Sequence, residues 1–414
     1  MIILLLLLVG SSLATQRINY ENYQVIRAIP TSEKSLRDLY EFVKKQPHLT
    51  YWKEPSNVGS AVDIMVSPKY KNSLEHFLKV NGIKSNIFIP DVGQLINEEK
   101  SSSGNSSAFG WDQYHTLDEI NTWLQNLTER FDEVKLIIIG RTYEGRNLTG
   151  VHISFSPNNS DRAVFVESNI HAEEWITSAV STFILNEILT SNDSDVRKMA
   201  ESYDWYFLPV ANPDGFVYSH EVDRTWRKTR TPYARGLFYG ADPNRNWDNH
   251  WHECGASSEP WSGNYAGPYP FSEICTKTMS EYLSTIGEKL VAYFDFHSYS
   301  QLLMVPYGYS PLPLDNYNLT YNIGLDAVKS LAKRYGTQYT VGNIYNTIYP
   351  ASGSSADWVK ASFRTPLVYA YELRDTGRYG FILPPDQIIP TSLETLDSIV
   401  TILRDYEETR NELL

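Results

Sequence analysis

Three strand-like stretches of the sequence end in side chains that bind metals or transfer protons. His171 and Glu174 follow the first stretch, His297 follows the second, and Glu372 follows the third. Because sites in open α/β sheets form at the carboxyl ends of strands, we expect these side chains to converge. Each histidine alone would be an ordinary hydrogen-bonded residue. Together, two imidazoles, one carboxylate and a water molecule match a catalytic zinc site, so the pattern predicts one Zn²⁺ bound by His171, Glu174 and His297.

A second group of metal-binding residue types is interpreted differently. His250, His252 and Cys254 lie close together, but in a loop rich in Gly, Ser and Trp and away from any strand end. We expect a structural loop there. The sequence contains neither HExxH nor G-x-S-x-G, which excludes a zincin and an α/β-hydrolase nucleophile.

Composition narrows the class of protein. The chain has 414 residues, 42% hydrophobic and 21% charged, with a net charge of −13. Its length predicts two or three globular domains, and its acidity argues against nucleic acid and anionic membranes as partners. The two cysteines, Cys254 and Cys275, exclude a disulfide scaffold. In an oxidising compartment we expect them to form one disulfide.

The elements that must position these residues form a large C-terminal unit, expected at 109–414. Near-continuous apolar strands alternate with helices, which predicts an α/β fold with a mixed, largely parallel twisted sheet covered on both faces. The expected strands are 135–140, 162–169, 204–210, 290–296 and 365–371, and the expected helices are 116–131, 176–189, 272–287 and 391–408, with capping boxes at Thr116 and Thr391.

A smaller unit is expected at 15–100. Strands at 20–29, 61–67 and 85–91 and helices at 31–45 and 73–82 predict a ferredoxin-like α+β domain. The polar stretch 97–107 predicts an exposed segment, with a linker at 101–108 and a trypsin-like cleavage site at Lys100.

The N-terminus predicts secretion. Residues 1–14 are apolar and end in small residues, as in a signal peptide, and no later stretch is long and apolar enough to span a membrane. Glycosylation sequons add weight to an extracellular location; they occur at Asn105, Asn126, Asn147, Asn158, Asn192 and Asn318.

Five motifs in order resemble the zinc carboxypeptidases of the pancreatic A/B type. They are HAEEW (171–175), WRKTR (226–230), NRNW (244–247), HSYS (297–300) and ELRDTGRYG (372–380). The resemblance covers nearly the whole chain. It implies that 15–100 is an inhibitory pro-domain and that 109–414 is a catalytic domain, and it supports the zinc ligands proposed above.

The resemblance also implies roles for other residues. Asp242 would orient His171, Glu372 would be the general base, and Arg227 would stabilise the oxyanion. A free C-terminal carboxylate would be bound by Asn244, Arg245 and Tyr349. Other positions that match the family's substrate-binding residues are Arg224, Tyr299, Met304, Gly308, Ile344, Ala351, Ala356, Ala370 and Phe381.

The wall of the side-chain pocket predicts specificity. The position that distinguishes A-type from B-type enzymes is Ala356, and the other matching positions are small or apolar. No charge is available there to pair with a basic side chain, so we expect cleavage of bulky aliphatic or aromatic C-terminal residues. Two alternatives are a B-type enzyme, disfavoured by Ala356, and a non-catalytic binding protein, disfavoured because the ligands and the base are all present.

Two departures from the family pattern stand out. Glu173 occupies a position where the family commonly has Arg, which predicts that substrates with an acidic penultimate residue are disfavoured. The positions of the family's disulfide cysteines carry Phe238 and Trp261, so the expected Cys254–Cys275 pair is not carried over from the family. The expected partners are peptides with a free C-terminus, a trypsin-like endoprotease and the chain's own pro-domain, and we expect a monomer.

Overall fold

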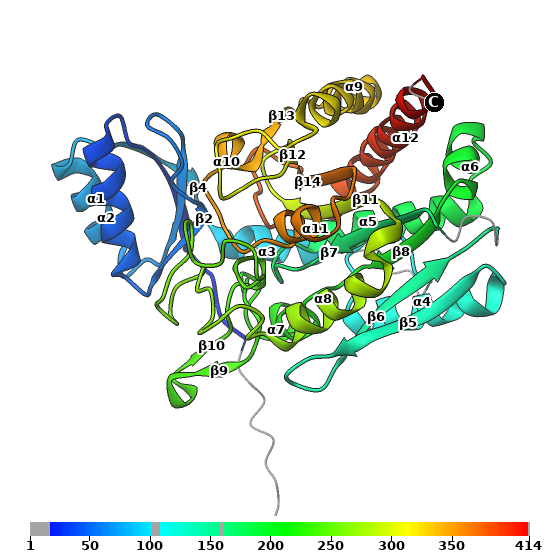
Figure 1. The fold of residues 1–414 in the computed structure, drawn as a ribbon. Coiled ribbons are helices and arrows are strands. Elements are labelled where there is room, and N and C mark those ends of the chain that lie inside the picture. The colour runs from blue at the N-terminus through cyan, green and yellow to red at the C-terminus, as the bar shows by residue number, and fades with distance from the viewer. Residues whose placement is uncertain (1–16, 102–107, 157–160, 413–414) are drawn as a thin grey trace, which may run out of the picture.

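The computed structural model describes residues 17–101, 108–156 and 161–412, which form two domains (Figure 1). The expected signal peptide at 1–14 and residues 102–107 of the expected linker lie outside the described residues. Asn105 and Asn158 also lie outside them, and the other four sequon asparagines are exposed. Among the described residues, no helix is both long and apolar enough to cross a bilayer.

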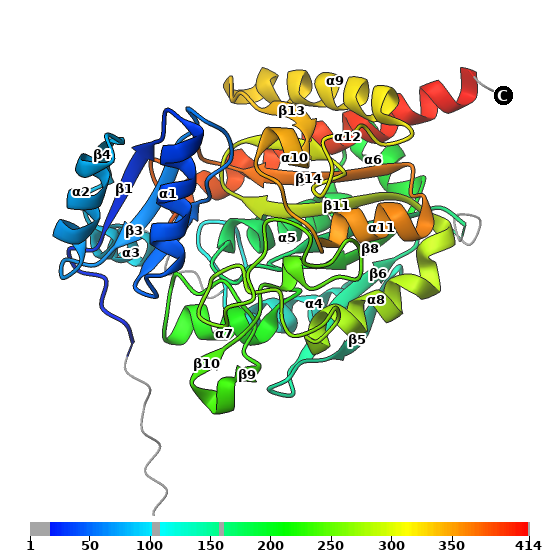
Figure 2. The same ribbon diagram turned by 60° about the vertical axis from the view of Figure 1, so that its left-hand side comes forward.

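The N-terminal domain is an antiparallel sheet packed against two helices. Its elements are β1 (Gln24–Ile29), α1 (Glu33–Lys44), β2 (Leu49–Lys53), β3 (Val62–Val66), α2 (Lys71–Val80), β4 (Lys84–Ile89) and α3 (Val92–Ser101). The strand order β2-β3-β1-β4 is the ferredoxin-like arrangement that the sequence predicts, although the pattern did not identify β2. Helices α1 and α2 lie beside this sheet (Figure 2). Leu39 of α1 and Leu74 of α2 belong to the same apolar cluster as residues of the strands.

Helix α3 corrects the predicted exposed segment at 97–107. Residues up to Ser101 are helical, because Val92, Ile96 and Glu99 follow helical spacing and form one buried face. Lys100, the predicted cleavage site, is exposed. The predicted cleavage point therefore lies in the last turn of α3.

The C-terminal domain contains an eight-stranded sheet in the order β13-β12-β14-β11-β7-β8-β6-β5. The strands are β5 (Val134–Arg141), β6 (Asn147–Ile153), β7 (Ala163–Ser168), β8 (Asp204–Leu208), β11 (Leu290–Ser298), β12 (Leu302–Val305), β13 (Thr340–Asn343) and β14 (Leu367–Leu373). Its centre is parallel and its two sides contain antiparallel pairs, which confirms the predicted α/β class. The sequence pattern did not identify β6 or the two short strands β12 and β13.

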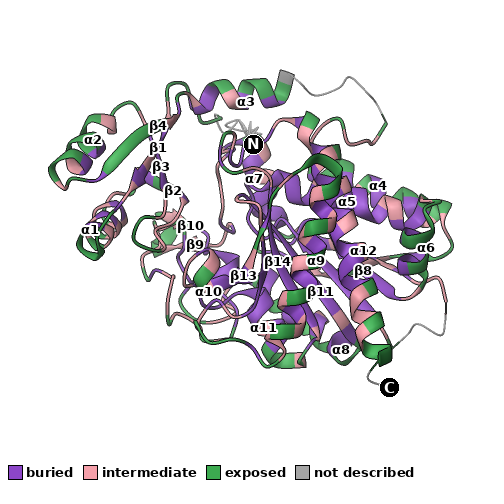
Figure 3. Cartoon of the chain, turned by 90° about the horizontal axis from the view of Figure 1, so that it is seen from above, coloured by how far each residue is buried: buried purple, intermediate pink, exposed green. Residues whose placement is uncertain are grey.

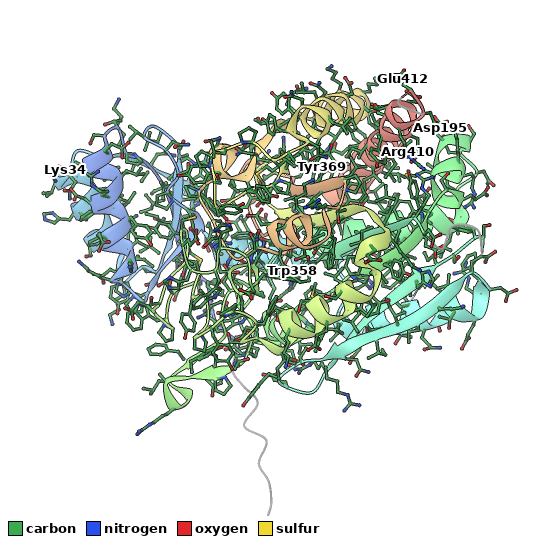
Figure 4. The ribbon with its side chains drawn as sticks, viewed as in Figure 1. Lys34, Asp195, Trp358, Tyr369, Arg410 and Glu412 are labelled. Carbon is green, nitrogen blue, oxygen red and sulfur yellow. The ribbon has the colours of Figure 1, made fainter. Side chains whose placement is uncertain are left out.

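Helices cover both faces of this sheet. They are α4 (Leu117–Arg130), α5 (Trp175–Thr190), α6 (Ser194–Glu201), α7 (Pro213–Glu221), α8 (Ile274–Ile286), α9 (Tyr317–Tyr335), α10 (Ile344–Thr347), α11 (Ser355–Phe363) and α12 (Ile388–Glu412). Two apolar clusters, one with α4, α5, α9 and α12 and one with α8, α10 and α11, fill the space between layers (Figure 3). In Figure 4, Tyr369 of β14 lies in this interior and Lys34 at the outer edge of the N-terminal domain.

One of the two predicted helix-capping boxes is confirmed. Thr116 forms the predicted capping box with Glu119 at the start of α4. Thr391 does not begin a helix, because α12 starts three residues earlier, and its hydroxyl donates to the Gln387 carbonyl instead. The β9 (Pro232–Tyr233) and β10 (Phe238–Tyr239) pair forms a small separate hairpin.

The predicted Cys254–Cys275 disulfide is wrong in this structure, where both thiols are free. Cys275 lies on α8 and points into an apolar cluster with Met279 and Phe165. Cys254 lies in a loop whose backbone is bound by the Ser352 hydroxyl. The helix therefore directs one thiol into the core while the loop holds the other elsewhere.

Candidate active site

The metal-binding side chains converge because β11 pairs in parallel with both β7 and β14. The carboxyl ends of the three strands consequently meet at one edge. His171 and Glu174 lie between β7 and α5, with Glu174 at the first turn of the helix. Their Nδ1 and Oε1 atoms are 2.9 Å apart, and His297 Nδ1 lies 3.1 Å from both His171 Nδ1 and Glu174 Oε2. The predicted convergence is thus present.

These side chains fit a bound dication. All three are buried, and one atom from each lies within 4.8 Å of the others. The two Nδ1 atoms face each other and the carboxylate, an arrangement that places lone pairs around one point. Burial opposes ionisation of Glu174, but His171 and His297 outweigh it and lower its pKa to about 2. Among the described residues no other group of three such side chains is close enough to bind a metal.

Asp242 lies behind His171, as predicted. Its Oδ1 is 3.1 Å from His171 Nε2, and its Oδ2 accepts hydrogen bonds from Arg227 Nε and Nη2 at 3.1 and 2.9 Å. The backbone N–H of Asn244 also donates to Asp242. Burial opposes the ionisation of Asp242, but Arg227 and His171 hold its pKa well below the usual range. One carboxylate therefore links a predicted metal ligand to the predicted oxyanion-stabilising Arg227.

Glu372 lies on β14 directly opposite His297 in the register with β11. Its side chain is buried. Burial, and then the charge of Glu174, raise the pKa of Glu372 to about 8. A carboxyl group with this pKa can both accept and donate a proton near neutral pH.

The predicted carboxylate-binding group contains an unsatisfied guanidinium. Arg245 donates from Nε to the Gly255 carbonyl and from Nη1 to the Asn244 carbonyl, at 2.8 and 3.0 Å. Its Nη2 is buried and has no hydrogen-bond partner within the described part of the chain. The ring centroid of Tyr349 is 5.6 Å from the guanidinium carbon. A buried donor without a partner is costly, so this geometry suits an incoming anion.

The predicted side-chain pocket is apolar. Met304 of β12 pairs with Ala370 of β14, and both belong to one buried cluster with Ile344 and Ala356. Ala351 is also buried. Gly308 must be glycine, since a Cβ atom would lie 2.6 Å from the Ala351 carbonyl oxygen.

Three predicted substrate-binding residues are covered by the N-terminal domain. Arg224 pairs with Glu99, and Tyr299 donates a hydrogen bond to Asp63 at 3.1 Å. The ring of Phe381 contacts Trp52, with centroids 5.3 Å apart. The N-terminal domain therefore occupies part of the predicted substrate cleft.

A cavity of about 430 Å³ remains between the two domains. His171, Glu174, Arg227 and Glu372 line it from the C-terminal domain, and Glu54 lines it from the N-terminal domain. Burial raises the pKa of Glu54, while Arg245 and Arg227 act in the opposite direction. The N-terminal domain thus places a carboxylate in the field of the predicted carboxylate-binding arginine.

Glu173, the unusual residue, is buried beside the same site. Its Oε1 lies 3.7 Å from Arg227 Nη1, and burial, followed by the charge of Glu174, raises its pKa to about 7 although Arg227 lowers it. In the second histidine group, His250 Nδ1 lies 2.9 Å from Glu253 Oε2, and both residues are exposed.

Sequence reasoning missed two acidic residues that touch the site. Asp295 lies two residues before His297 on β11, and its Oδ2 is 3.0 Å from His297 Nε2. The available signal was a charged residue inside an otherwise apolar strand, which requires a partner. Glu99 was hidden in a polar stretch that resembled a linker.

Comparisons with known proteins agree with these observations. The zinc carboxypeptidase family matches residues 120–398, and the carboxypeptidase activation peptide family matches residues 26–99. The chain is 43% identical over 398 residues to zinc carboxypeptidase A 1 of Anopheles gambiae, covering 95% of this chain and 91% of that protein. It is 39% identical over 420 residues to zinc carboxypeptidase A 1 of Drosophila melanogaster, covering 98% and 96%. Its structure is similar to that of carboxypeptidase A from Helicoverpa armigera, with a TM-score of 0.85 and 26% identity over 94% of this chain and 98% of that one.

Proposed function

This chain belongs to the zinc carboxypeptidase family and carries the family's activation peptide; we propose that it is a secreted A-type enzyme made as a zymogen. It releases bulky aliphatic or aromatic residues from peptides with a free C-terminus. The observation that supports this most directly is the unpartnered Nη2 of Arg245 beside an apolar pocket and a metal-binding cluster.

Zinc is the enzyme's cofactor, and His171, Glu174 and His297 would bind it. When bound, Zn²⁺ polarises the scissile carbonyl and lowers the pKa of a water molecule. Glu372 takes a proton from the attacking water and later gives it to the leaving amine. Its buried position at the end of β14, opposite His297 in the register with β11, places this carboxyl group beside the proposed metal ligands.

Arg227 and Arg245 bind negative charge at different points. Arg227 stabilises the charge that develops on the scissile carbonyl oxygen, while Asp242 holds its guanidinium in place through two hydrogen bonds. Arg245, with Asn244 and Tyr349, binds the carboxylate of the substrate's last residue. The carboxylate of a free C-terminus would supply the acceptor that Arg245 Nη2 lacks, which supports an exopeptidase rather than an endopeptidase.

The pocket beside Arg245 accepts the last side chain. Its lining residues, Met304, Ile344, Ala356 and Ala370, bear no charge. Burying a Lys or Arg side chain there would leave its charge unpaired, which is costly. Apolar C-terminal residues are therefore preferred.

The pro-domain, proposed at 15–100, inhibits the enzyme before secretion is complete. Its residues Glu99, Asp63 and Trp52 contact three residues proposed to bind substrate. Cleavage by a trypsin-like endoprotease at the exposed Lys100, directly before the proposed 101–108 linker, would release the 109–414 domain, with the linker attached, as a monomer. The apolar segment 1–14 supports export to the extracellular space.

Three blocked dipeptides test the proposal, with Phe, Lys or Glu at the C-terminus. The secreted protein is assayed before and after brief trypsin treatment, with and without a chelator. We expect release of Phe only after trypsin and only without chelator. Release of Lys would mean a B-type pocket, and no release by a zinc-loaded protein would mean a binding protein.

A further inference from the structure

The interior of β11 contains an unusual polar row that ends at a metal ligand. Tyr293, Asp295 and His297 alternate along the strand, so their side chains share one face of the sheet. All three are buried. Asp295 has no role in the proposed reaction, yet it directly contacts His297.

The ring nitrogens of His297 have opposite requirements. Its Nδ1 faces His171 and Glu174, so it must offer a lone pair to a metal ion there. A neutral imidazole then carries its proton on Nε2, and this N–H needs an acceptor. His171 is in the same situation, and Asp242 accepts from it.

Two groups lie close enough to His297 Nε2 to be considered as that acceptor. Asn244 Nδ2 is 3.0 Å away, but the amide oxygen of Asn244 already accepts from the Ser355 backbone N–H at 2.9 Å. Asn244 therefore turns its NH₂ group, a donor, toward the ring. Asp295 Oδ2, also 3.0 Å from Nε2, is the remaining candidate, since a carboxylate oxygen accepts hydrogen bonds.

A second polar group besides His297 helps to hold Asp295 in place. The Ser355 hydroxyl donates to Asp295 Oδ2 at 3.2 Å, while Oδ1 has no hydrogen-bond partner in the part of the chain that the structure describes. Glu167 lies beside it in register on β7 and also has one unpartnered oxygen. Burial, and then the charge of Asp295, raise the pKa of Glu167 to about 8, so Glu167 is mostly neutral at pH 7.

We propose that Asp295 is a positioning residue that fixes the Nε2–H tautomer and the ring orientation of His297, so that a carboxylate stands behind each histidine of the zinc site. The inference rests on the ligand set in the proposed function. A carboxylate behind a ligating histidine raises the ligand's basicity and strengthens metal binding. Its cost is a buried charge beside Glu167, which destabilises the zinc-free protein.

The test measures zinc affinity in the full zymogen by competition with a chromophoric chelator. Asp295→Ala removes the acceptor and should weaken zinc binding by about 100-fold, and Asp295→Asn, whose amide oxygen can still accept, by about 10-fold. Ser355→Ala should cause a smaller loss. The visible spectrum of the Co²⁺-substituted protein should also change in the Asp295 variants, because the ring of His297 is no longer held.

Asp204→Asn is the matched control, since Asp204 is a buried aspartate on the same sheet whose Oδ2 lies 3.1 Å from His152 Nε2, away from the metal cluster. It should leave zinc affinity unchanged. Denaturant unfolding of the zinc-free proteins distinguishes a residue that positions His297 from one that only stabilises the fold. We expect the Asp295→Asn protein to be at least as stable as wild type. If Asp295 only stabilised the fold, the variant would be less stable and its zinc affinity would be unchanged.

Two results would overturn the inference. The first is a wild-type zinc affinity in folded Asp295→Asn and Asp295→Ala. If these variants do not fold, the second is an unchanged zinc affinity together with an unchanged Co²⁺ spectrum in Ser355→Ala. Failure of the proposed function looks different, because the wild-type protein itself would then bind no zinc or release no C-terminal residue.

Discussion

A buried ion pair between Arg224 and Glu99 joins the enzyme to its pro-domain. The guanidinium donates from Nε and Nη2 to the two carboxylate oxygens at 2.9 and 2.8 Å. The side chains are only 1% and 3% exposed, and Arg224 also stacks 3.6 Å from the Trp175 ring centroid. Glu99→Gln removes the charge while keeping the size of the side chain.

The expected effect follows from desolvation. Breaking a buried pair by removing one partner costs about 3 to 5 kcal/mol, because the other charge stays buried and uncompensated. At about 1.4 kcal/mol per tenfold change, this weakens docking of the pro-domain by roughly 100- to 4,000-fold. Glutamine can still accept one hydrogen bond from Arg224, so we expect a value near 100-fold.

The assay compares activity before and after cleavage. Uncleaved Glu99→Gln zymogen should hydrolyse a blocked dipeptide ending in Phe about 100-fold faster than uncleaved wild type, up to the limit set by the mature enzyme. Cleavage after Lys100 removes residue 99, so both proteins yield the same mature enzyme, whose activity normalises the measurement. Glu98→Gln is the matched control, because Glu98 is the adjacent glutamate, is exposed, and accepts a hydrogen bond from Gln94 of the same helix at 2.7 Å.

The reasoning is refuted if the uncleaved Glu99→Gln and Glu98→Gln zymogens are equally inactive while their mature enzymes match wild type. Inhibition would then depend on the apolar contacts around Trp52 and Phe381, and not on the ion pair.

Three further predictions concern the mature enzyme. Glu372→Gln should lower kcat/KM by about 10²- to 10⁴-fold with full zinc content, measured by metal analysis beside the kinetics; activity near wild type would exclude it as the general base. Ala356→Asp should shift preference from Phe to Lys or Arg at the C-terminus, compared with Ala356→Ser as an uncharged control, and an unchanged preference would place the specificity wall elsewhere. At pH 8, Glu173 should be ionised, since its pKa is raised to about 7, so peptides with penultimate Asp should react more slowly than those with Lys. Glu173→Gln should reduce this difference, and equal turnover of both peptides by the wild-type enzyme would contradict the prediction.

The sequence predicted the metal site well because long apolar strands are easy to recognise. The three central strands β7, β11 and β14 are almost fully buried, and each precedes or contains a functional side chain. Parallel pairing then brings their ends together without further information. The short strands β12 and β13, with four residues each, carry too little pattern to be recognised.

Contacts between distant residues explain what could not be predicted. Glu99 and Arg224 are 125 residues apart, and nothing in the polar sequence around Glu99 indicates a buried partner. Asp295, in contrast, does break the local pattern, because it places a charged residue inside the otherwise apolar stretch LVAYFDF. Residues that break a local pattern in this way deserve a search for a partner across the sheet.

An aromatic contact and hydrogen bonds hold the loop that carries Asn244 and Arg245, with no disulfide among the described residues. The resemblance placed the family's disulfide at Phe238 and Trp261, and the ring centroids of these two residues are 5.7 Å apart. Such a contact contributes about 0.5 to 1.5 kcal/mol beyond its buried area, less than the roughly 2 to 4 kcal/mol of a typical disulfide.

Hydrogen bonds to a second loop supply the remaining restraint. The Trp247 N–H donates to the Gly353 carbonyl at 3.0 Å, and the Ser352 hydroxyl binds the backbone of Cys254 on both its N–H and carbonyl sides. Residue 353 must be glycine, because its φ is +74° and a Cβ atom would lie 2.5 Å from the Arg245 carbonyl oxygen. These contacts join the loop of Arg245 to the loop that follows Tyr349. The two sides of the carboxylate-binding group are therefore fixed to each other directly, which preserves their geometry without a disulfide.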